Sequence, residues 1–318
     1  MTTTVSPAAC RSAMTLLRIA PARRAHPTLI THAAFATATP AERFVGFLPG
    51  GITMRFSALA LVLASAPGLS SAQAVGLPDS GQGSCDNGAN VMVACSAANT
   101  GDGTTYPRQD GRFGRDAKAA AGALIKVGAG AAGFDYTKVA NNGTDVPAAT
   151  ALGANAADWA CTRDNVTGLT WEVKTADGGL RDWNRSYAWY DSNGATNGGN
   201  AGYTGNDACS NTLPDLCNTE ALATAVNAAA LCTYTDWRLP TYRELLTLVH
   251  YGTYTPSIDT TYFPNTQTWL YWTASSFARD PRDAWLVAFD TGNSNHVRKP
   301  LFVLDTFYPA RLVRGVPF

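Results

Sequence analysis

The sequence predicts an α+β fold, because signals for two helices are followed by a run of extended segments in the C-terminal half of the chain. All eight tryptophans lie between Trp159 and Trp285, so we expect the packed core there, since large aromatic side chains bury well. One helix signal covers residues 219–232, and the second begins just after Pro240. Helices that precede a group of strands, instead of alternating with them, are typical of the α+β class.

The first predicted helix is supported by the spacing of its apolar residues. Leu222, Val226 and an alanine at position 229 or 230 fall on one face of a helix. Asn218 or Thr219 is expected to cap its N-terminus.

The second helix has the clearest start signal in the chain. Thr241 can cap it with its hydroxyl, and Glu244 can accept from the amide of the cap, which is the reciprocal pairing of a capping box. Pro240 keeps the residue before it out of helical geometry. Apolar residues within 245–249 supply a buried stripe, and we expect Gly252 to mark the end of this short helix.

Strands are predicted on both sides of the two helices. Leu169, Trp171 and Val173 alternate with polar residues and predict one strand. Residues 191–206 are rich in Gly and Asn and predict a surface loop. The extended segments after the second helix are 269–274, 284–289 with a turn at 290–292, and 309–316.

The first 74 residues are predicted to be absent from the mature protein. Met54 and Arg55, the apolar stretch 56–63 and the sequence Ala-Gln-Ala at 72–74 have the order of a basic segment, an apolar segment and a signal-peptide cleavage site in residues 54–74. Translation is therefore expected to start at Met54, with residues 1–53 a disordered, mis-annotated upstream segment. The alternative is an organellar transit peptide, because residues 1–53 hold five arginines and one acidic residue.

The remaining chain is predicted to be a soluble protein of the periplasm or the cell exterior. Residues 75–318 hold 18 basic and 23 acidic residues, a net charge of −5, which gives no general attraction to nucleic acid. No other stretch has the length of a membrane-spanning helix. Residues 159–318 are expected to form the main domain. Residues 75–158 are expected to be a loosely ordered extension with a small disulfide loop, docked through Phe113, Leu124, Ile125, Val127, Phe134 and Tyr136.

The cysteines predict disulfides. Seven cysteines become six when Cys10 is excluded with the leader, and an even number in an exported chain is typical of disulfide bonding. No Cys-x-x-Cys motif occurs, so we predict no metal site, no thiol redox site and no cofactor. Of the fifteen possible pairings, proximity favours Cys85 with Cys95 and Cys209 with Cys217, which leaves Cys161 with Cys232.

Five segments resemble, in order, motifs of the Lcl C-terminal domain family, a bacterial module named after a collagen-like adhesin. They are 164–172, 236–245, 271–276, 284–289 and 311–314, so the resemblance covers roughly residues 161–315. It implies a C-type-lectin-like fold in which the first and last strands of the domain pair, with Trp171 in one and residues 311–314 in the other. Members are often exported, and a few are known to bind glycans.

Most motif residues are expected to build the fold. Arg238 is expected to pair with a buried carboxylate or a backbone carbonyl, and the hydroxyls of Ser275 and Ser276 to hold local backbone turns. The residues with this predicted structural role are Trp171, Trp237, Arg238, Pro240, Thr241, Glu244, Trp272, Ser275, Ser276, Arg311 and Arg314.

A binding surface is predicted in the segments that follow residue 268, where the resemblance places ligand-binding loops. Exposed aromatic faces beside polar groups suit sugars, and a cationic cluster suits an anionic polysaccharide. The alternative is that this cluster is a solvated loop paired with Asp280, Asp283 and Asp290. The candidates are the aromatic residues Trp269, Tyr271, Phe277 and Tyr308, and the basic residues Arg279, Arg282, His296, Arg298 and Lys299.

No enzymatic activity is predicted. His250 and His296 are the two histidines after residue 74, and neither belongs to a motif with a serine or cysteine nucleophile. Glu-Pro-Asn and Gln-Pro-Asp triplets, which calcium-dependent lectins of this fold use, do not occur. We expect an exported module that binds a glycan or a cell-surface protein. The first alternative is a structural or assembly protein that forms homo-oligomers, and the second is a polysaccharide hydrolase.

Overall fold

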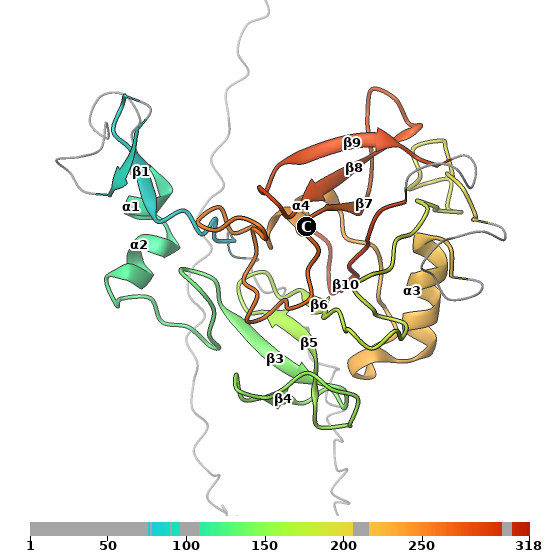
Figure 1. Ribbon diagram of the computed structural model, residues 1–318, viewed down its shortest axis with the longest axis horizontal. Coiled ribbons are helices and arrows are strands. Elements are labelled where there is room, and N and C mark those ends of the chain that lie inside the picture. Colours follow the sequence, from blue (N-terminus) through green and yellow to red (C-terminus); the bar gives the residue numbers. More distant parts are fainter. Residues whose placement is uncertain (1–75, 77, 90, 96–107, 206–215, 301–306) are drawn as a thin grey trace, which may run out of the picture. The chain divides into compact units, whose positions relative to one another are not determined.

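Helices are few in the described residues and the strands form antiparallel sheets, which places the fold in the α+β class (Figure 1). The computed structural model describes residues 76, 78–89, 91–95, 108–205, 216–300 and 307–318. The predicted leader, residues 1–74, lies outside the described residues, as does Cys209. None of the described helices is long and apolar enough to cross a membrane.

The largest sheet has five strands in the order β10-β6-β5-β3-β4. Val313 pairs with Trp171, and Arg314 with Thr170, so the Trp171 strand lies beside the last strand, as the resemblance implies. The Trp171 strand is not the first strand of the predicted domain, because the strand Trp159–Asp164 precedes it. The sheet also continues upstream of Trp159, because β3 pairs along β5. The strands are β3 (Tyr136–Ala140), β4 (Asp145–Val146), β5 (Trp159–Asp164), β6 (Thr170–Glu172) and β10 (Val313–Arg314).

The extension is anchored by fewer apolar residues than its sequence predicts. Phe134 and Tyr136 are buried in the main core, where the ring of Tyr136 meets the edge of Phe263. By contrast, Ile125 is 94% exposed and Val127 is 81% exposed, while Phe113 is also exposed and Leu124 is half-buried. The expectation that Phe113, Ile125 and Val127 anchor the extension was therefore wrong. The pairing of β3 with β5 holds the extension to the main domain instead.

A second sheet has three strands in the order β7-β8-β9: β7 (Leu270–Ser276), β8 (Asp283–Ala288) and β9 (Ser294–Arg298). The predicted turn at 290–292 joins β8 to β9, and Gly292 has the left-handed φ of 76° that favours glycine. Strand β9 was not predicted, because its residues are polar and mostly exposed and give no apolar alternation. It is an edge strand that pairs with β8 on one side.

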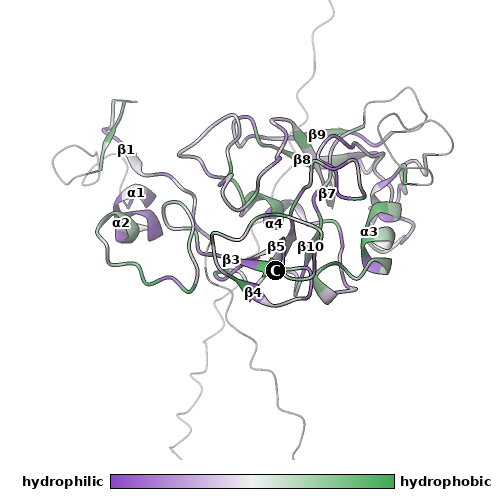
Figure 2. Cartoon of the chain, turned by 60° about the horizontal axis from the view of Figure 1, so that its bottom comes forward, coloured by the Kyte–Doolittle hydropathy of each residue, from purple (hydrophilic) through white to green (hydrophobic). Residues whose placement is uncertain are grey.

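Helix α3 (Thr219–Ala228) packs the buried residues Leu222 and Val226 into the core, and its mixed hydropathy is visible in Figure 2. The side chain of Asn218 caps it by accepting from the amide of Ala221 at 2.8 Å. The helix stops before Cys232, because Ala230 has a left-handed φ of 48°. A 3₁₀ turn, η2 (Leu231–Thr233), follows.

Helix α4 (Tyr242–Leu246) begins at the predicted capping box. It is shorter than predicted, since Thr247 bonds back to the carbonyl of Glu244 at 2.7 Å and Gly252 has no left-handed φ. His250 is therefore not at the helix end. Its backbone amide instead donates to Ser257, and its ring packs against Phe134.

The remaining elements belong to the N-terminal extension. A two-stranded sheet pairs β1 (Ser84–Asp86) with β2 (Met92–Ala94), and the disulfide Cys85–Cys95 links β1 to the residue after β2. Two short helices follow, α1 (Asp110–Phe113) and α2 (Arg115–Ala120).

The cap of α4 gives a direct test of its local contribution. Replacing Thr241 with alanine removes the hydroxyl that accepts from the amide of Glu244 at 3.3 Å. We expect the free energy of unfolding of the full chain to fall by about 1 kcal/mol in urea denaturation. The control is Thr241→Ser, which keeps the hydroxyl and should lose less. An alanine variant as stable as the wild type would contradict the assigned cap.

Candidate functional site

The motif residues converge on a buried carboxylate at the joint between β6 and the C-terminal segment. Glu172 is fully buried, and its Oε1 accepts from Nζ of Lys174 at 2.9 Å. Its Oε2 accepts from the amide of Leu312 at 2.8 Å, and its backbone carbonyl accepts from Arg311 at 2.7 Å. Burial lowers the pKa of Lys174, and the charge of Glu172 acts in the opposite direction. These contacts are structural, because they hold β6 against the C-terminal segment.

A second buried carboxylate organises the start of α4. The two terminal guanidinium nitrogens of Arg238 donate to the carboxylate of Glu244, at 2.8 and 2.6 Å, and this carboxylate also accepts from the amide of Thr241 at 2.7 Å. The backbone of Arg238 bridges to Val313, which joins this motif to β10. Bidentate pairing of this kind fixes geometry as well as charge.

The other residues with a predicted structural role also make fold contacts. Trp237 is buried and its Nε1 donates to the carbonyl of Leu231 at 3.1 Å. Trp171 and Trp272 are fully buried, and Arg314 pairs with Asp236 at 2.9 Å. Ser275 accepts from the amide of Tyr242, and Ser276 donates to the carbonyl of Asn197.

Two predicted ligand-binding residues are corrected by the structure. Tyr271 is fully buried, with its ring edge against Phe289, so it has no free face for a ligand. Lys299 is also fully buried. Its Nζ donates to the carbonyls of Asn197 and Asn200 and to Oγ of Ser276, at 2.8, 2.8 and 2.9 Å, and burial lowers its pKa to about 8. Lys299 therefore holds the 191–206 loop and is not part of a surface cluster.

The basic residues that remain exposed are largely paired with acids. Arg282 bonds to Asp280 at 2.7 Å, and this pairing lowers the pKa of Asp280 to about 2. Arg298 and His296 both contact Asp283, at 3.1 and 3.0 Å. The alternative given by the sequence, a solvated and salt-bridged surface, therefore describes this group better than a free cationic patch. Two further candidates lie here: exposed Arg279, and Phe277, whose ring stacks on His296 at 3.8 Å.

Trp269 lies at the opposite end of the same sheet. It immediately precedes β7, next to the turn from β8 to β9, because Leu270 pairs with Ala288. Its side chain is 53% exposed, and its ring lies nearly parallel to Tyr308, with centroids 6.5 Å apart. The register of β7 and β8 thus separates Trp269 from the salt-bridged basic residues.

A groove of about 270 Å³ borders Trp269. Among the described residues, neither the side chain of Asn293 nor the indole of Trp269 forms a hydrogen bond. Both groups are therefore open to a ligand. The remaining lining residues are Leu270, Ala288, Asp290, Thr291, Ser294 and Asn295. We call this concavity the Trp269 groove.

A larger concavity of about 350 Å³ lies beside α3 and is lined by Trp189, Trp237, Asp191 and Glu220, among others. Its two tryptophans are 1% and 2% exposed, so neither offers a face for stacking. Its carboxylates already accept hydrogen bonds from the loop that begins at residue 191: Asp191 accepts from the hydroxyl of Thr196, and Glu220 accepts from the amide of Ser192. The Trp269 groove is the better candidate for ligand contact.

These features define an α+β domain in which β6 pairs with the last strand, β10, and whose motif residues form buried ion pairs. Residues 160–314, from β5 to β10, match the family model described as the Lcl C-terminal domain. The match confirms the resemblance seen in the sequence motifs. No curated protein and no solved structure matches the chain significantly.

Sequence reasoning named Trp269 and missed the polar side chains around it. Asn293, Ser294 and Asn295 belong to the turn and strand that the sequence did not resolve as β9. Their signal was the run of Asp, Thr, Gly, Asn and Ser after position 289, which predicts a turn and carries donors and acceptors.

Proposed function

We propose that this protein is an exported binding module that recognises a neutral glycan through the Trp269 groove, without catalysis. The observation that carries the proposal is the half-exposed ring of Trp269 beside polar side chains in one groove. Sugar rings offer apolar C–H faces that pack on aromatic rings, and hydroxyls that bond to amides and carboxylates. Such a groove needs no cofactor.

The ion pairs around Asp280 and Asp283 favour a neutral glycan over the anionic polysaccharide suggested by the basic residues alone. A guanidinium already paired with a carboxylate must give up that partner before it can bind a sulfate. The disulfides support export, because such bonds persist in oxidising compartments outside the cytosol. The pairing of β6, near the start of the domain, with the last strand, β10, supports a C-type-lectin-like arrangement.

A glycan array with the full chain tests the proposal. We expect binding to neutral oligosaccharides, and we expect Trp269→Ala to weaken the affinity for the best of them about tenfold or more. The matched control is Trp183→Ala, because Trp183 is 40% exposed and does not line the Trp269 groove. Its binding should equal that of the wild type.

A second variant separates the neutral from the anionic ligand. Replacing Arg279, Arg282 and Arg298 together with alanine should leave binding to neutral glycans unchanged, and the affinity should vary little with salt. Selective binding to sulfated chains that this variant abolishes, while Trp269→Ala retains it, would contradict the proposal.

A further inference from the structure

Three aspartates from separate parts of the N-terminal extension meet at one point. Asp79 precedes β1, Asp110 is the first residue of α1, and Asp116 is the second residue of α2. One carboxylate oxygen from each lies within 4.8 Å of the others. Asp79 is 6% exposed and Asp116 is 4% exposed, whereas Asp110 faces solvent. We call these residues the aspartate cluster.

The hydrogen bonds within the protein satisfy only some of the carboxylate oxygens of the aspartate cluster. The amide of Gly133 donates to Oδ2 of Asp79 and to Oδ1 of Asp116, each at 2.8 Å, and Ser80 donates to Asp110. The other oxygens of the two buried carboxylates, Oδ1 of Asp79 and Oδ2 of Asp116, are buried without a hydrogen-bond partner. Buried polar groups are nearly always hydrogen-bonded or ligated, so each of these two orphaned oxygens indicates a missing partner.

The basic side chains nearby do not supply that partner. Arg115 donates its Nε to the carbonyl of Gly133, and Lys126 donates to the carbonyls of Gly130 and Ala132. Among the described residues, no lysine, arginine or histidine forms an ion pair with the aspartate cluster.

We propose that Asp79, Asp110 and Asp116 bind one calcium ion. Oxygen-only donors suit hard cations, and the absence of nitrogen or sulfur donors in the cluster argues against zinc. Calcium–oxygen distances of about 2.3–2.6 Å allow ligands on opposite sides of the ion to lie about 5 Å apart. Magnesium requires about 2.0–2.1 Å and near-ideal octahedral geometry and usually keeps several waters, so a site made of several protein carboxylates suits calcium better.

The proposed ion would fasten the extension to the rest of the protein. The aspartate cluster joins the segment before β1 to α1 and α2, and through Gly133 it reaches the chain that enters β3. The extension buries few apolar side chains, so a cation at this point supplies order that its small core does not.

Calorimetric titration of the full chain with calcium chloride, after removal of metal with a chelator, tests the site. We expect one calcium per chain, with affinity reduced at least tenfold in both Asp79→Asn and Asp116→Asn. Asparagine keeps the oxygen that accepts from Gly133, so these variants should still fold. The control is Asp145→Asn, which removes an exposed carboxylate that pairs with Arg163; it should bind calcium as the wild type does.

Thermal unfolding separates a cation site from a merely structural cluster. Calcium should raise the Tm of the wild type, and the same calcium concentration should raise the Tm of both Asp→Asn variants much less. In chelator, the variants should melt at or above the wild-type temperature, because each removes a buried like charge. No binding by the wild type, undiminished binding by the variants, or magnesium binding as tight as calcium binding would overturn the proposal.

Discussion

Replacing Glu172 with glutamine is expected to destabilise the fold by about 3–5 kcal/mol, the usual result of removing one partner from a buried ion pair. Glutamine keeps the size of the side chain and an oxygen for the amide of Leu312. It removes the negative charge that faces Lys174, Arg181 and Arg311. The side chain of Lys174 is 3% exposed, so its ammonium group cannot reach water without opening the joint between β6 and β10.

A double-mutant cycle in urea denaturation tests whether Glu172 and Lys174 stabilise the fold as a pair. Lys174→Met alone should lower the free energy of unfolding by less than Glu172→Gln does, because Glu172 keeps its hydrogen bond to the amide of Leu312. The double variant should recover part of the loss, since no uncompensated ammonium group remains buried. Additive losses, or a Glu172→Gln variant within about 1 kcal/mol of the wild type, would show that Glu172 does not lock the two strands.

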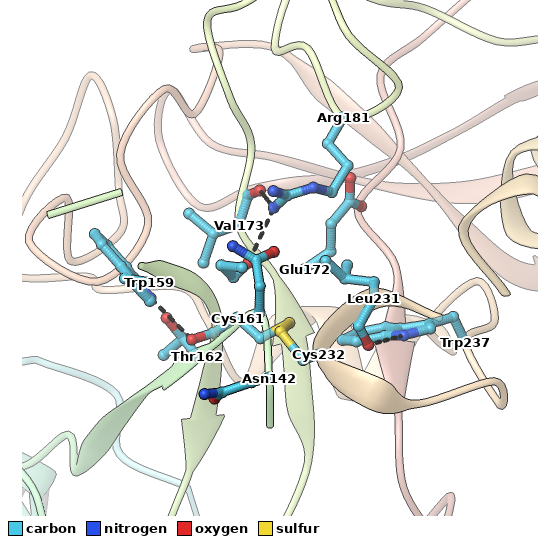
Figure 3. Close-up of a disulfide and its surroundings, with 12 residues drawn as sticks. Asn142, Trp159, Cys161, Thr162, Glu172, Val173, Arg181, Leu231, Cys232 and Trp237 are labelled. Carbon is cyan, nitrogen blue, oxygen red and sulfur yellow. Dashed lines mark hydrogen bonds between the residues drawn. A yellow bond between two sulfur atoms is a disulfide. The ribbon is translucent and has the colours of Figure 1, made fainter. Parts of the chain in front are cut away.

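Removal of the disulfide Cys161–Cys232 is expected to have the second large effect. This bond joins β5 to the turn after α3, as the cysteine spacing predicts, and its partners are 71 residues apart (Figure 3). Closing a loop of that length restricts the unfolded chain enough to stabilise the fold by about 4 kcal/mol. We expect the Cys161→Ala, Cys232→Ala double variant to lose about that much free energy of unfolding.

The contacts around this disulfide indicate that its removal loosens the core in particular. Nε1 of Trp159 donates to the carbonyl of Cys161 at 2.8 Å, and Nε1 of Trp237 donates to the carbonyl of Leu231, the residue before Cys232. Both cysteines lie in one buried cluster with Leu222 and Trp237. Quenching of tryptophan fluorescence should therefore report the loosening of this region directly.

The chain offers a matched control in the other described disulfide. Cys85–Cys95 closes a separation of only 10 residues, so the same chain-entropy relation gives about 3 kcal/mol. The variant without this bond should lose less, and its tryptophan fluorescence should stay native, because all tryptophans lie downstream. Cys217 is also disulfide-bonded, while its predicted partner Cys209 lies outside the described residues. Equal losses in the two variants would contradict the expected dependence on loop length.

Local rules predicted the features that depend on neighbours in the chain. Thr241 and Glu244 are three residues apart, so their reciprocal capping follows from sequence alone. The Cys161–Cys232 pair was reached by elimination among six cysteines. The strand pairing of Trp171 with Val313 came from the family resemblance and was confirmed.

Long-range contacts explain what the sequence did not predict. Lys299 was assigned to a surface cluster because it lies beside the basic residues His296 and Arg298 in the sequence, but its acceptors at Asn197, Asn200 and Ser276 are far away in the chain. For the candidate site, Trp269 is exposed and Tyr271, two residues later, is buried, although residues at this spacing in one strand share a face. Trp269 precedes the first residue of β7, so the alternation of the strand does not extend to it. Both residues are aromatic, so their side chains alone do not predict which one is exposed.

The NMR signals of the tryptophan indole N–H groups test the central claim most directly. The eight tryptophans give up to eight indole signals, and Trp269→Ala identifies one of them by its loss. On addition of the best neutral oligosaccharide from the array, we predict a saturable shift of the Trp269 signal, with the signals of the buried Trp171, Trp189 and Trp272 unchanged. A saturable shift confined to Trp285, beside His296 at the other end of the sheet, would contradict the account, as would binding that leaves the Trp269 signal in place.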